Sequence, residues 1–328
     1  MKKISLFLVA IMMAFSFVIT GCGSKDNVIR VNEVTHSIFY APLYVAINNG
    51  YFEDEGLTIE LTNGGGSDKS MTALVSGSAD VALAGPETVV YVAAQGKKDQ
   101  PKVFGQLTRC DGSFIVGREQ IDNFTLADLS GKEIIGGRPG GMPAMTLEHV
   151  VREAGVPNVT FNTTIDFNNT TAAFLGGTAD FVTAFEPVAS EIQAQGRGYI
   201  LASVGELSGD IPYTAFIATE SFLNKNADKA EAFLRAVQRA YEFIMNPNTT
   251  IDQIVDALYP SFNTSSKASI RASVVSYKGI NAWNNGPVMT EQSYNNLVEI
   301  LTEAGTLTTN VTFSQVVDNT IANKVMAN

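Results

Sequence analysis

Residues 74–81 read LVSGSADV, and residues 174–181 read FLGGTADF. In each stretch an apolar helix end meets a glycine turn, after which Ala-Asp leads into an apolar run that ends at a proline, Pro86 or Pro187. A proline at that point is typical of the start of a helix. Two lobes of similar helix–strand construction explain the repeat economically. Chance is the alternative, since glycine turns and apolar strands are common in any α/β fold.

Outward from these two stretches, short β-branched runs alternate with amphipathic segments that begin or end at glycine or proline. This alternation predicts an α/β fold whose strands are largely parallel. The predicted strands are residues 28–31, 57–61, 80–84, 103–107, 113–116, 133–136, 159–161, 179–184 and 200–202. The predicted helices among them begin at Pro42, Ser67, Pro86, Pro143 and Thr170.

Beyond about Tyr213 the pattern becomes helical. Apolar side chains recur at helical spacing from Asn226 to Met245, and the further helical segments are residues 251–259, 266–277, 290–304 and 313–322. We assign these helices to the first lobe. The predicted boundaries are residues 28–117 and 213–328 for lobe 1 and residues 118–212 for lobe 2, so the chain crosses between lobes near residues 117–122 and 207–213.

The 328 residues are 45% hydrophobic and 17% charged, with a formal net charge of -11. A chain of this length suits two domains that each bury a core. The acidic balance and the lack of clustered Lys and Arg exclude a nucleic-acid partner, because phosphate binding depends on such clusters. The 2 cysteines allow neither a disulfide framework nor a thiolate zinc site.

The first residues have the layout of a secretory signal peptide. Two lysines precede a mostly apolar run over residues 4–19, which is shorter than the ~20 residues that a membrane-spanning helix needs. The run leads into ITGC at residues 19–22, which resembles a bacterial lipobox whose Cys22 is acylated and becomes the new N-terminus. We predict a signal peptide at residues 1–21 and a lipidated Cys22 with a tether over residues 22–27. A signal cut elsewhere, with an incidental Cys22, is the alternative.

Processing at this point changes the charge and the thiol content of the mature chain. Loss of Lys2 and Lys3 takes the net charge from -11 to -13, and lipidation of Cys22 leaves Cys110 as the only thiol. We therefore expect an exported monomer without disulfides, held by its lipid at the outer face of the cytoplasmic membrane, or located in the periplasm.

Two further stretches carry a family resemblance. Residues 36–46, HSIFYAPLYVA, and residues 50–57, GYFEDEGL, resemble the solute-binding lipoproteins of ABC importers. Within them, the sequence is similar to the NMT1/SsuA-like branch, which handles sulfonates, taurine, nitrate and thiamine-precursor pyrimidines. LVSGSADV, DLSGK at residues 128–132, GRPGG at residues 137–141 and the Glu186-Pro187 turn support the resemblance, which covers essentially the whole mature chain.

The resemblance implies a fold and a set of partners. The fold is a two-lobe, periplasmic-binding-protein-like (type II) α/β fold, with the ligand cleft between lobes that two hinge strands join. The partners are a small-molecule solute, an ABC permease and its ATPase, and the membrane through the lipid on Cys22. No enzymatic activity and no cofactor are implied.

An enzyme is the alternative from another class. A neighbouring branch makes the thiamine pyrimidine and sacrifices a histidine beside a cysteine-rich iron motif, whereas here Tyr40 stands in the corresponding slot and Cys110 stands alone. No phosphate-binding loop, H-E-x-x-H helix or G-x-S-x-G elbow occurs. With only His36 and His149, a multi-histidine metal site is excluded, and we expect neither catalytic residues nor a metal. A surface adhesin or scaffold is a third hypothesis.

Ligands of open α/β sheets bind beyond the C-terminal ends of strands, where loops and helix N-termini meet. With Arg109 added as a candidate cation, this rule gives the candidate ligand-binding residues His36, Phe39, Tyr40, Gly66, Ser67, Glu87, Thr88, Arg109, Gly140, Gly141, Met142 and Glu186. Structural alternatives stay open for several of them: an ordinary N-cap at Ser67, core packing for Phe39 and Tyr40, and complementing the helix dipole for Glu87.

The charges near the cleft set the expected solute. Glu186 ends an apolar strand, and a carboxylate there accepts hydrogen bonds from an amine or a ring N–H. If Glu87 and Glu186 both face the cleft, a thiamine-precursor pyrimidine or a similar nitrogen heterocycle fits best. A guanidinium from Arg109 or Arg138 in the cleft would instead favour an aliphatic sulfonate, taurine or nitrate.

Overall fold

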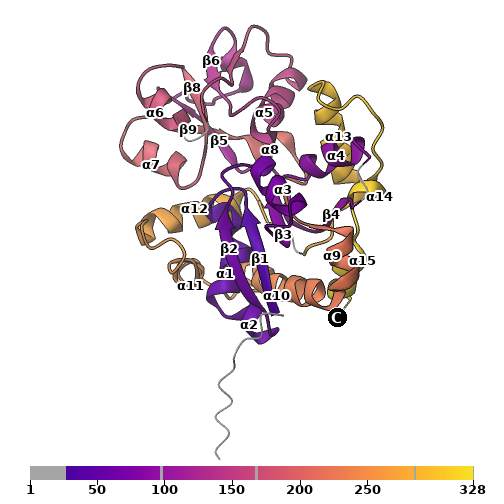
Figure 1. The fold of residues 1–328 in the computed structure, drawn as a ribbon. Coiled ribbons are helices and arrows are strands. Elements are labelled where there is room, and N and C mark those ends of the chain that lie inside the picture. Colours follow the sequence, from indigo (N-terminus) through magenta and orange to yellow (C-terminus); the bar gives the residue numbers. More distant parts are fainter. Residues whose placement is uncertain (1–26, 97–98, 167–168, 284–285, 328) are drawn as a thin grey trace, which may run out of the picture.

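The computed structural model describes residues 27–96, 99–166, 169–283 and 286–327. These residues form two five-stranded mixed sheets with helices around them (Figure 1). The predicted signal peptide and the predicted lipidation site, Cys22, lie outside the described residues. Among the described residues, no helix combines the length and the apolar character needed to cross a membrane.

The first sheet has one strand, β10, that runs against its neighbours. The order of the sheet is β2 (Thr58–Asn63), β1 (Val28–Glu33), β3 (Val81–Ala84), β10 (Thr214–Thr219) and β4 (Pro101–Thr108). β1 pairs in parallel with β2 and β3, whereas β10 is antiparallel to β3 and β4. All four residues of β3 are buried, which is typical of a central strand that is covered on both faces.

The second sheet repeats this arrangement, with β5 as the reversed strand. Its order is β7 (Thr160–Asn162), β6 (Glu133–Ile135), β8 (Phe181–Phe185), β5 (Ser113–Gly117) and β9 (Tyr199–Ser203). β6 is parallel to β7 and β8, and β5 is antiparallel to β8 and β9. The sequence repeat at residues 74–81 and 174–181 leads into β3 and β8, which hold equivalent places in the two sheets. Two lobes of similar construction therefore account for the repeat.

Helices surround both sheets. Those before β4 and after β10 are η2 (Ile38–Tyr40), α1 (Ala41–Asn48), α2 (Tyr51–Asp54), α3 (Ser67–Val75), α4 (Glu87–Ala94), α9 (Glu220–Lys225), α10 (Ala227–Met245), α11 (Ile251–Leu258), α12 (Lys267–Gly279), α13 (Glu291–Glu303), α14 (Phe313–Val316) and α15 (Thr320–Met326). Those between β5 and β10 are η3 (Leu126–Leu129), α5 (Met142–Glu153), α6 (Thr170–Leu175), α7 (Val188–Ala194) and α8 (Val204–Ser208).

The longest of these helices is α10, which lies in the lower part of the view in Figure 1. It packs against α1, α2 and α15, and its buried face includes Phe233 and Leu234. The ring of Phe233 lies 4.9 Å from that of Phe216 in β10, and Tyr241 donates to the Gln106 carbonyl of β4 at 2.9 Å. Each fully buried side chain of this size contributes ~1.5–3 kcal/mol.

The two crossings between the sheets differ in part from the predicted boundaries. β5 was expected in the first lobe, within residues 28–117, but it pairs with β8 and β9 of the second sheet. The chain therefore leaves the first sheet between Thr108 and Ser113 and returns to it between Ser203 and Thr214. β5 is a five-residue strand in which every residue is buried, and its sequence does not indicate which of the two sheets it joins.

Two other differences from the predicted elements have local causes. β10 was not predicted, because its first five residues are all buried, so that TAFIAT shows no alternation, and a long helical stretch follows directly. The single helix predicted at residues 313–322 is divided into α14 and α15. Val317, which lies between them, forms an isolated parallel bridge with Val103 of β4, and this pairing interrupts the helix.

Candidate functional site

A cavity of about 560 Å³ lies between the two sheets, within the usual size range of small-molecule sites. The loop after β1, the glycine loop before α3 and the start of α4 line it on the first-sheet side. The start of α5, the start of α6 and residues 183–188 around the end of β8 line it on the other side. The cavity thus lies at the C-terminal ends of parallel strands, as expected.

The cavity brings together eight of the twelve predicted residues. The lining includes His36, Tyr40, Gly66, Ser67, Glu87, Gly141, Met142 and Glu186. The residues that do not line it are Phe39, Thr88, Arg109 and Gly140. Proximity to a strand end selects the correct loops, but it does not tell which side chains in a loop turn inward.

Glu87 is the cavity residue with the most perturbed carboxyl group. It lies in the first turn of α4 and is only 3% exposed. Burial raises its pKa to about 7, against the opposing effects of its own backbone N–H and of Arg138. Its Oε2 atom has no hydrogen-bond partner among the described residues. A buried acceptor without a donor is costly, so the carboxyl is poised to receive one from a ligand.

Gly85 allows this placement of Glu87. A Cβ atom at position 85 would lie 1.9 Å from Oε2 of Glu87, so any other residue there would displace the carboxyl group. The Gly85 N–H donates to Ser67 Oγ at 3.2 Å, which ties the start of α4 to the start of α3. Ser67 is the first residue of α3, with Gly66 at the N-cap, so the structure does not bear out the N-cap alternative for Ser67.

His36 is fixed at the edge of the cavity with an acceptor near each ring nitrogen. Nδ1 lies 3.1 Å from the carboxylate of Glu33, and Nε2 lies 2.9 Å from the carbonyl oxygen of Ser261. The ring stacks on Phe262 at 4.5 Å, and Tyr44 donates to the same carboxylate. Two acceptors favour the doubly protonated imidazolium, and the hydrogen bond to Glu33 is the main cause of the raised pKa of His36.

Tyr40 forms part of the wall beneath these groups. It is 5% exposed, and its hydroxyl hydrogen-bonds to Thr214, the first residue of β10. Burial raises its pKa well above the ordinary tyrosine value, so the phenol remains neutral and offers an aromatic face with a polar edge.

Glu186 lines the cavity, but its carboxylate already has protein donors. Ser190 donates to it from both its backbone N–H and its hydroxyl, at 3.0 and 2.8 Å, and Ser276 Oγ donates at 2.8 Å. The Glu186 N–H in turn donates to the Tyr277 hydroxyl at 3.0 Å. Glu186 therefore joins β8 to α7 and α12, and Glu87 is the carboxyl better placed to accept from a solute.

The two arginines that were weighed as candidate cations lie in different places. Arg138 lines the cavity and forms a 2.8 Å ion pair with Asp68 of α3, across the gap between the sheets. Arg109 lies outside the lining and pairs with Asp210 at 3.4 Å. The charge of Arg138 is thus largely offset by its partner.

The other residues outside the lining have structural roles. Phe39 is fully buried, with its ring 5.0 Å from Tyr277 and 5.9 Å from Tyr213. It is therefore a core residue, which was the structural alternative to ligand binding. Thr88 donates its hydroxyl to the Gly85 carbonyl at 2.7 Å. Gly140 adopts a φ of 70° in the turn before α5, a conformation that favours glycine.

Several cavity residues were not predicted from the sequence. They are Val34, Thr35, Lys69, Pro143, Asp166, Thr170, Thr171, Thr183, Ala184, Phe185, Pro187, Val188, Tyr213 and Thr214. Thr214 belongs to the unpredicted β10, and Tyr213 comes directly before it. β10 is antiparallel to β3, with Ala215 opposite Ala84, so recognition of that strand would have placed both residues near the C-terminal end of β3. The described lining contains one histidine and no cysteine.

Comparison with known proteins gives concordant matches. A family model described as "NMT1/THI5 like" matches residues 38–250. A Bacillus subtilis (strain 168) protein named "Putative binding protein YtlA" is 39% identical, with 94% of this chain and 93% of that protein covered. The 4-amino-5-hydroxymethyl-2-methylpyrimidine phosphate synthase of Aspergillus parasiticus is 25% identical, with 71% of each chain covered.

Among solved structures, the periplasmic aliphatic sulphonate binding protein SsuA from Escherichia coli superposes with a TM-score of 0.70. The match covers 89% of this chain and 97% of that chain at 17% sequence identity. At this identity the likeness shows the fold, which is the two-lobed α/β fold of periplasmic binding proteins. The predicted fold class is therefore confirmed.

Proposed function

Since the chain belongs to the NMT1/THI5-like family, we propose that it is the extracytoplasmic solute-binding component of an ABC importer. The observation that carries the proposal is the cavity of about 560 Å³ whose walls come from both sheets. A molecule held there contacts both lobes, so binding favours the closed arrangement that a permease would recognise. The permease and its ATPase are the expected partners.

We further propose that the solute presents an N–H donor to Glu87, as a thiamine-precursor pyrimidine or a similar nitrogen heterocycle does. The Glu87 carboxyl is buried with one oxygen unpaired, and Tyr40 supplies an aromatic wall. A hydrogen bond from an amine or a ring N–H removes the cost of that unpaired acceptor.

A sulfonate or nitrate receptor is the second candidate within the same class. Lys69 and Arg138 line the cavity and would attract an anion, as would the imidazolium of His36. Arg138 is already paired with Asp68, however, and the ionised Glu87 would repel an anionic solute.

The enzymatic alternative rests on the 25% identical pyrimidine synthase. A synthase of that kind, as the sequence resemblance implied, sacrifices a histidine beside a cysteine-rich motif. The described lining holds His36, which is fixed by Glu33, and no cysteine. The proposal is therefore a receptor that returns its solute unchanged.

The location follows from the sequence. We propose export by the signal peptide at residues 1–21 and retention by a lipid on Cys22. A Cys22→Ala variant is expected to leave the membrane fraction, and one that stays as firmly bound as the parent would refute the anchor.

A thermal-shift screen tests the receptor and its solute class together. Pyrimidines, flavins, aliphatic sulfonates, taurine and nitrate are each added to the full chain, because a ligand of the native state raises stability by RT ln(1 + [L]/Kd). We expect stabilisation by nitrogen heterocycles and recovery of the same molecule by mass spectrometry. Glu87→Gln should reduce that shift, and Glu60→Gln, an exposed carboxylate of β2, should not.

Each other outcome contradicts a defined part of the proposal. Stabilisation by sulfonates or nitrate alone overturns the assignment of the solute class. A converted product overturns the receptor in favour of the enzyme. No stabilisation by any compound favours the adhesin or scaffold hypothesis.

A further inference from the structure

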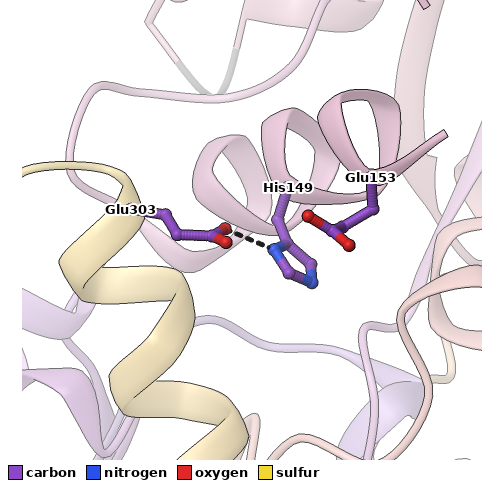
Figure 2. A group of neighbouring side chains, drawn as sticks. All are labelled: His149, Glu153 and Glu303. Carbon is purple, nitrogen blue, oxygen red and sulfur yellow. Dashed lines mark hydrogen bonds and ion pairs between the residues drawn. The ribbon is translucent and has the colours of Figure 1, made fainter. Parts of the chain in front are cut away.

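One histidine and two glutamates from two helices meet outside the cavity. His149 and Glu153 belong to α5 and Glu303 to α13. Each offers one potential ligand atom, and these atoms all lie within 4.8 Å of one another. Figure 2 shows the imidazole between the two carboxylates, with the dashed contact to Glu303. From the sequence we expected no metal, because the distance along the chain between His149 and Glu303 hid this set.

Helix geometry and packing produce the cluster. His149 and Glu153 are four residues apart on α5, so they project from the same face of the helix. Glu303 is the last residue of α13, which packs against α5. The His149 side chain is 17% exposed and that of Glu303 is 26% exposed, and Nδ1 of His149 lies 2.7 Å from Oε2 of Glu303. Both groups are thus held in place yet reachable from solvent.

We propose that His149, Glu153 and Glu303 form a binding site for a divalent first-row transition-metal ion of the zinc type, which joins α5 to α13. Zinc binds His nitrogen and Glu oxygen at ~2.0–2.2 Å, so tetrahedral ligand atoms are ~3.4 Å apart. Nδ1 of His149 and Oε2 of Glu303 are 2.7 Å apart, which is less than this value, and the three candidate ligand atoms all lie within 4.8 Å of one another. Small side-chain rotations suffice, and water completes the coordination.

The charges around the cluster fit a cation. Two carboxylates and an imidazole face each other, and imidazole with carboxylate is a ligand set that zinc accepts. Arg152 also bonds to Oε2 of Glu303 and competes with the ion. A carboxylate has two oxygens, so Glu303 can keep Arg152 on one and bind the ion through the other. The guanidinium then holds Glu303 in place while it lowers the affinity by repulsion.

The site links the two halves of the fold. Leu147 and Val151 of α5 pack with Ile134 and Phe181 of the second sheet. α13 packs on α14, which contacts β4 and α4 beside the first sheet. None of the three ligand residues lines the cavity, so the metal site is independent of the proposed solute site.

Titration of the full chain with Zn²⁺, without any solute, tests the proposal. We expect one ion to bind with a Kd of about 10 µM or tighter, and Co²⁺ to give the visible absorption of tetrahedral coordination. His149→Gln and Glu303→Gln should each weaken binding at least about tenfold. Arg152→Gln should strengthen it severalfold, because it removes a repelling charge, whereas a purely structural cluster predicts no gain.

Glu291→Gln supplies the matched control, since it makes the same charge change at the opposite end of α13. It should leave the affinity unchanged. Zn²⁺ should also raise the melting temperature of the parent chain by a few degrees and lose this effect in His149→Gln, which circular dichroism can show to be folded. Equal affinity in parent, His149→Gln and Glu303→Gln, or no binding below ~1 mM, overturns the site.

Discussion

Glu87 combines features that make a residue useful for binding and costly for stability. Glu87 lines the cavity and is 3% exposed, and one of its carboxyl oxygens has no donor among the described residues. Binding sites commonly hold such groups, because a ligand and not the fold supplies the missing partner. We therefore expect Glu87 to destabilise the apo protein at neutral pH, and a solute that donates to its carboxyl group to remove that cost.

Glu87→Gln tests this cost. The folded pKa of about 7 lies above the usual value of 4.5, so the folded state binds more protons, and the stability contribution falls as pH rises from 4.5 through 7. At pH 8 the buried charge costs ~3 kcal/mol. The apo variant should therefore exceed the parent in free energy of unfolding at pH 8 and match it more closely at pH 5, as urea titrations can measure. If the stability of Glu87→Gln relative to the parent is lower at pH 8 than at pH 5, the raised pKa of Glu87 is contradicted.

His36 gives the opposite pH dependence. Its hydrogen bonds to Glu33 and to the Ser261 carbonyl raise its pKa above 6.5, so its contribution to stability is full below pH 6.5 and is lost as pH rises through the folded value. The deficit of His36→Gln in urea unfolding should thus be larger at pH 6 than at pH 9. A deficit that is constant or grows with pH would show that the imidazolium is not the form that the fold holds.

The sequence predicts helices and strands better than it predicts contacts between residues that are far apart in the chain. Ser67 and Pro86 mark two helix starts in the sequence, and both helices are observed. The hydrogen bond from the Gly85 N–H to Ser67 Oγ, which spans 18 residues, has no sequence signal. Proximity to strand ends found Glu87 and His36, which line the cavity, and also Phe39, which packs in the core. The periodicity of the sequence does not show which side chains of a loop point into the cavity. β10 escaped prediction because burial on both faces removes the alternation that identifies a strand.

One of the contacts between α12 and the end of β8 is a buried hydrogen bond that a single substitution removes. The Tyr277 hydroxyl accepts from the Glu186 N–H at 3.0 Å, and both residues are buried. Tyr277→Phe leaves that N–H without an acceptor and should cost ~2 kcal/mol of unfolding free energy. Tyr259→Phe, at a residue that is 37% exposed, should change it by less than ~0.5 kcal/mol. Equal effects of the two variants in denaturant titrations would remove this contact from the account.

In the part of the chain that the structure describes, residues from both lobes line the cavity, and the chain passes between the two sheets twice. Motion of one lobe relative to the other therefore bends short connections and leaves each sheet intact. Contacts across the gap, such as Arg138 with Asp68, join the two sides of the cavity. Both side chains are partly exposed, so their contribution is modest.

The Arg138–Asp68 pair should affect solute retention more than stability. Arg138→Gln and Asp68→Asn are each expected to weaken solute binding about two- to fivefold, with the double variant no weaker than the singles. Arg109→Gln, which breaks the pair with Asp210 outside the cavity, is the control and should leave the affinity unchanged. Strictly additive losses in a titration of all four proteins would show that the pair does not act as a unit.

We expect Glu87 to accept a hydrogen bond from a nitrogen-bearing solute inside the cavity. Calorimetric titration of the best solute at pH 7, in two buffers that differ in ionisation enthalpy, measures it most directly. Because the free carboxyl is about half protonated at its pKa of about 7, an N–H donor should release up to ~0.5 proton per solute, and Glu87→Gln should abolish the release. Uptake of a proton on binding, lost in the same variant, would show that the solute is an anion and would contradict the claim.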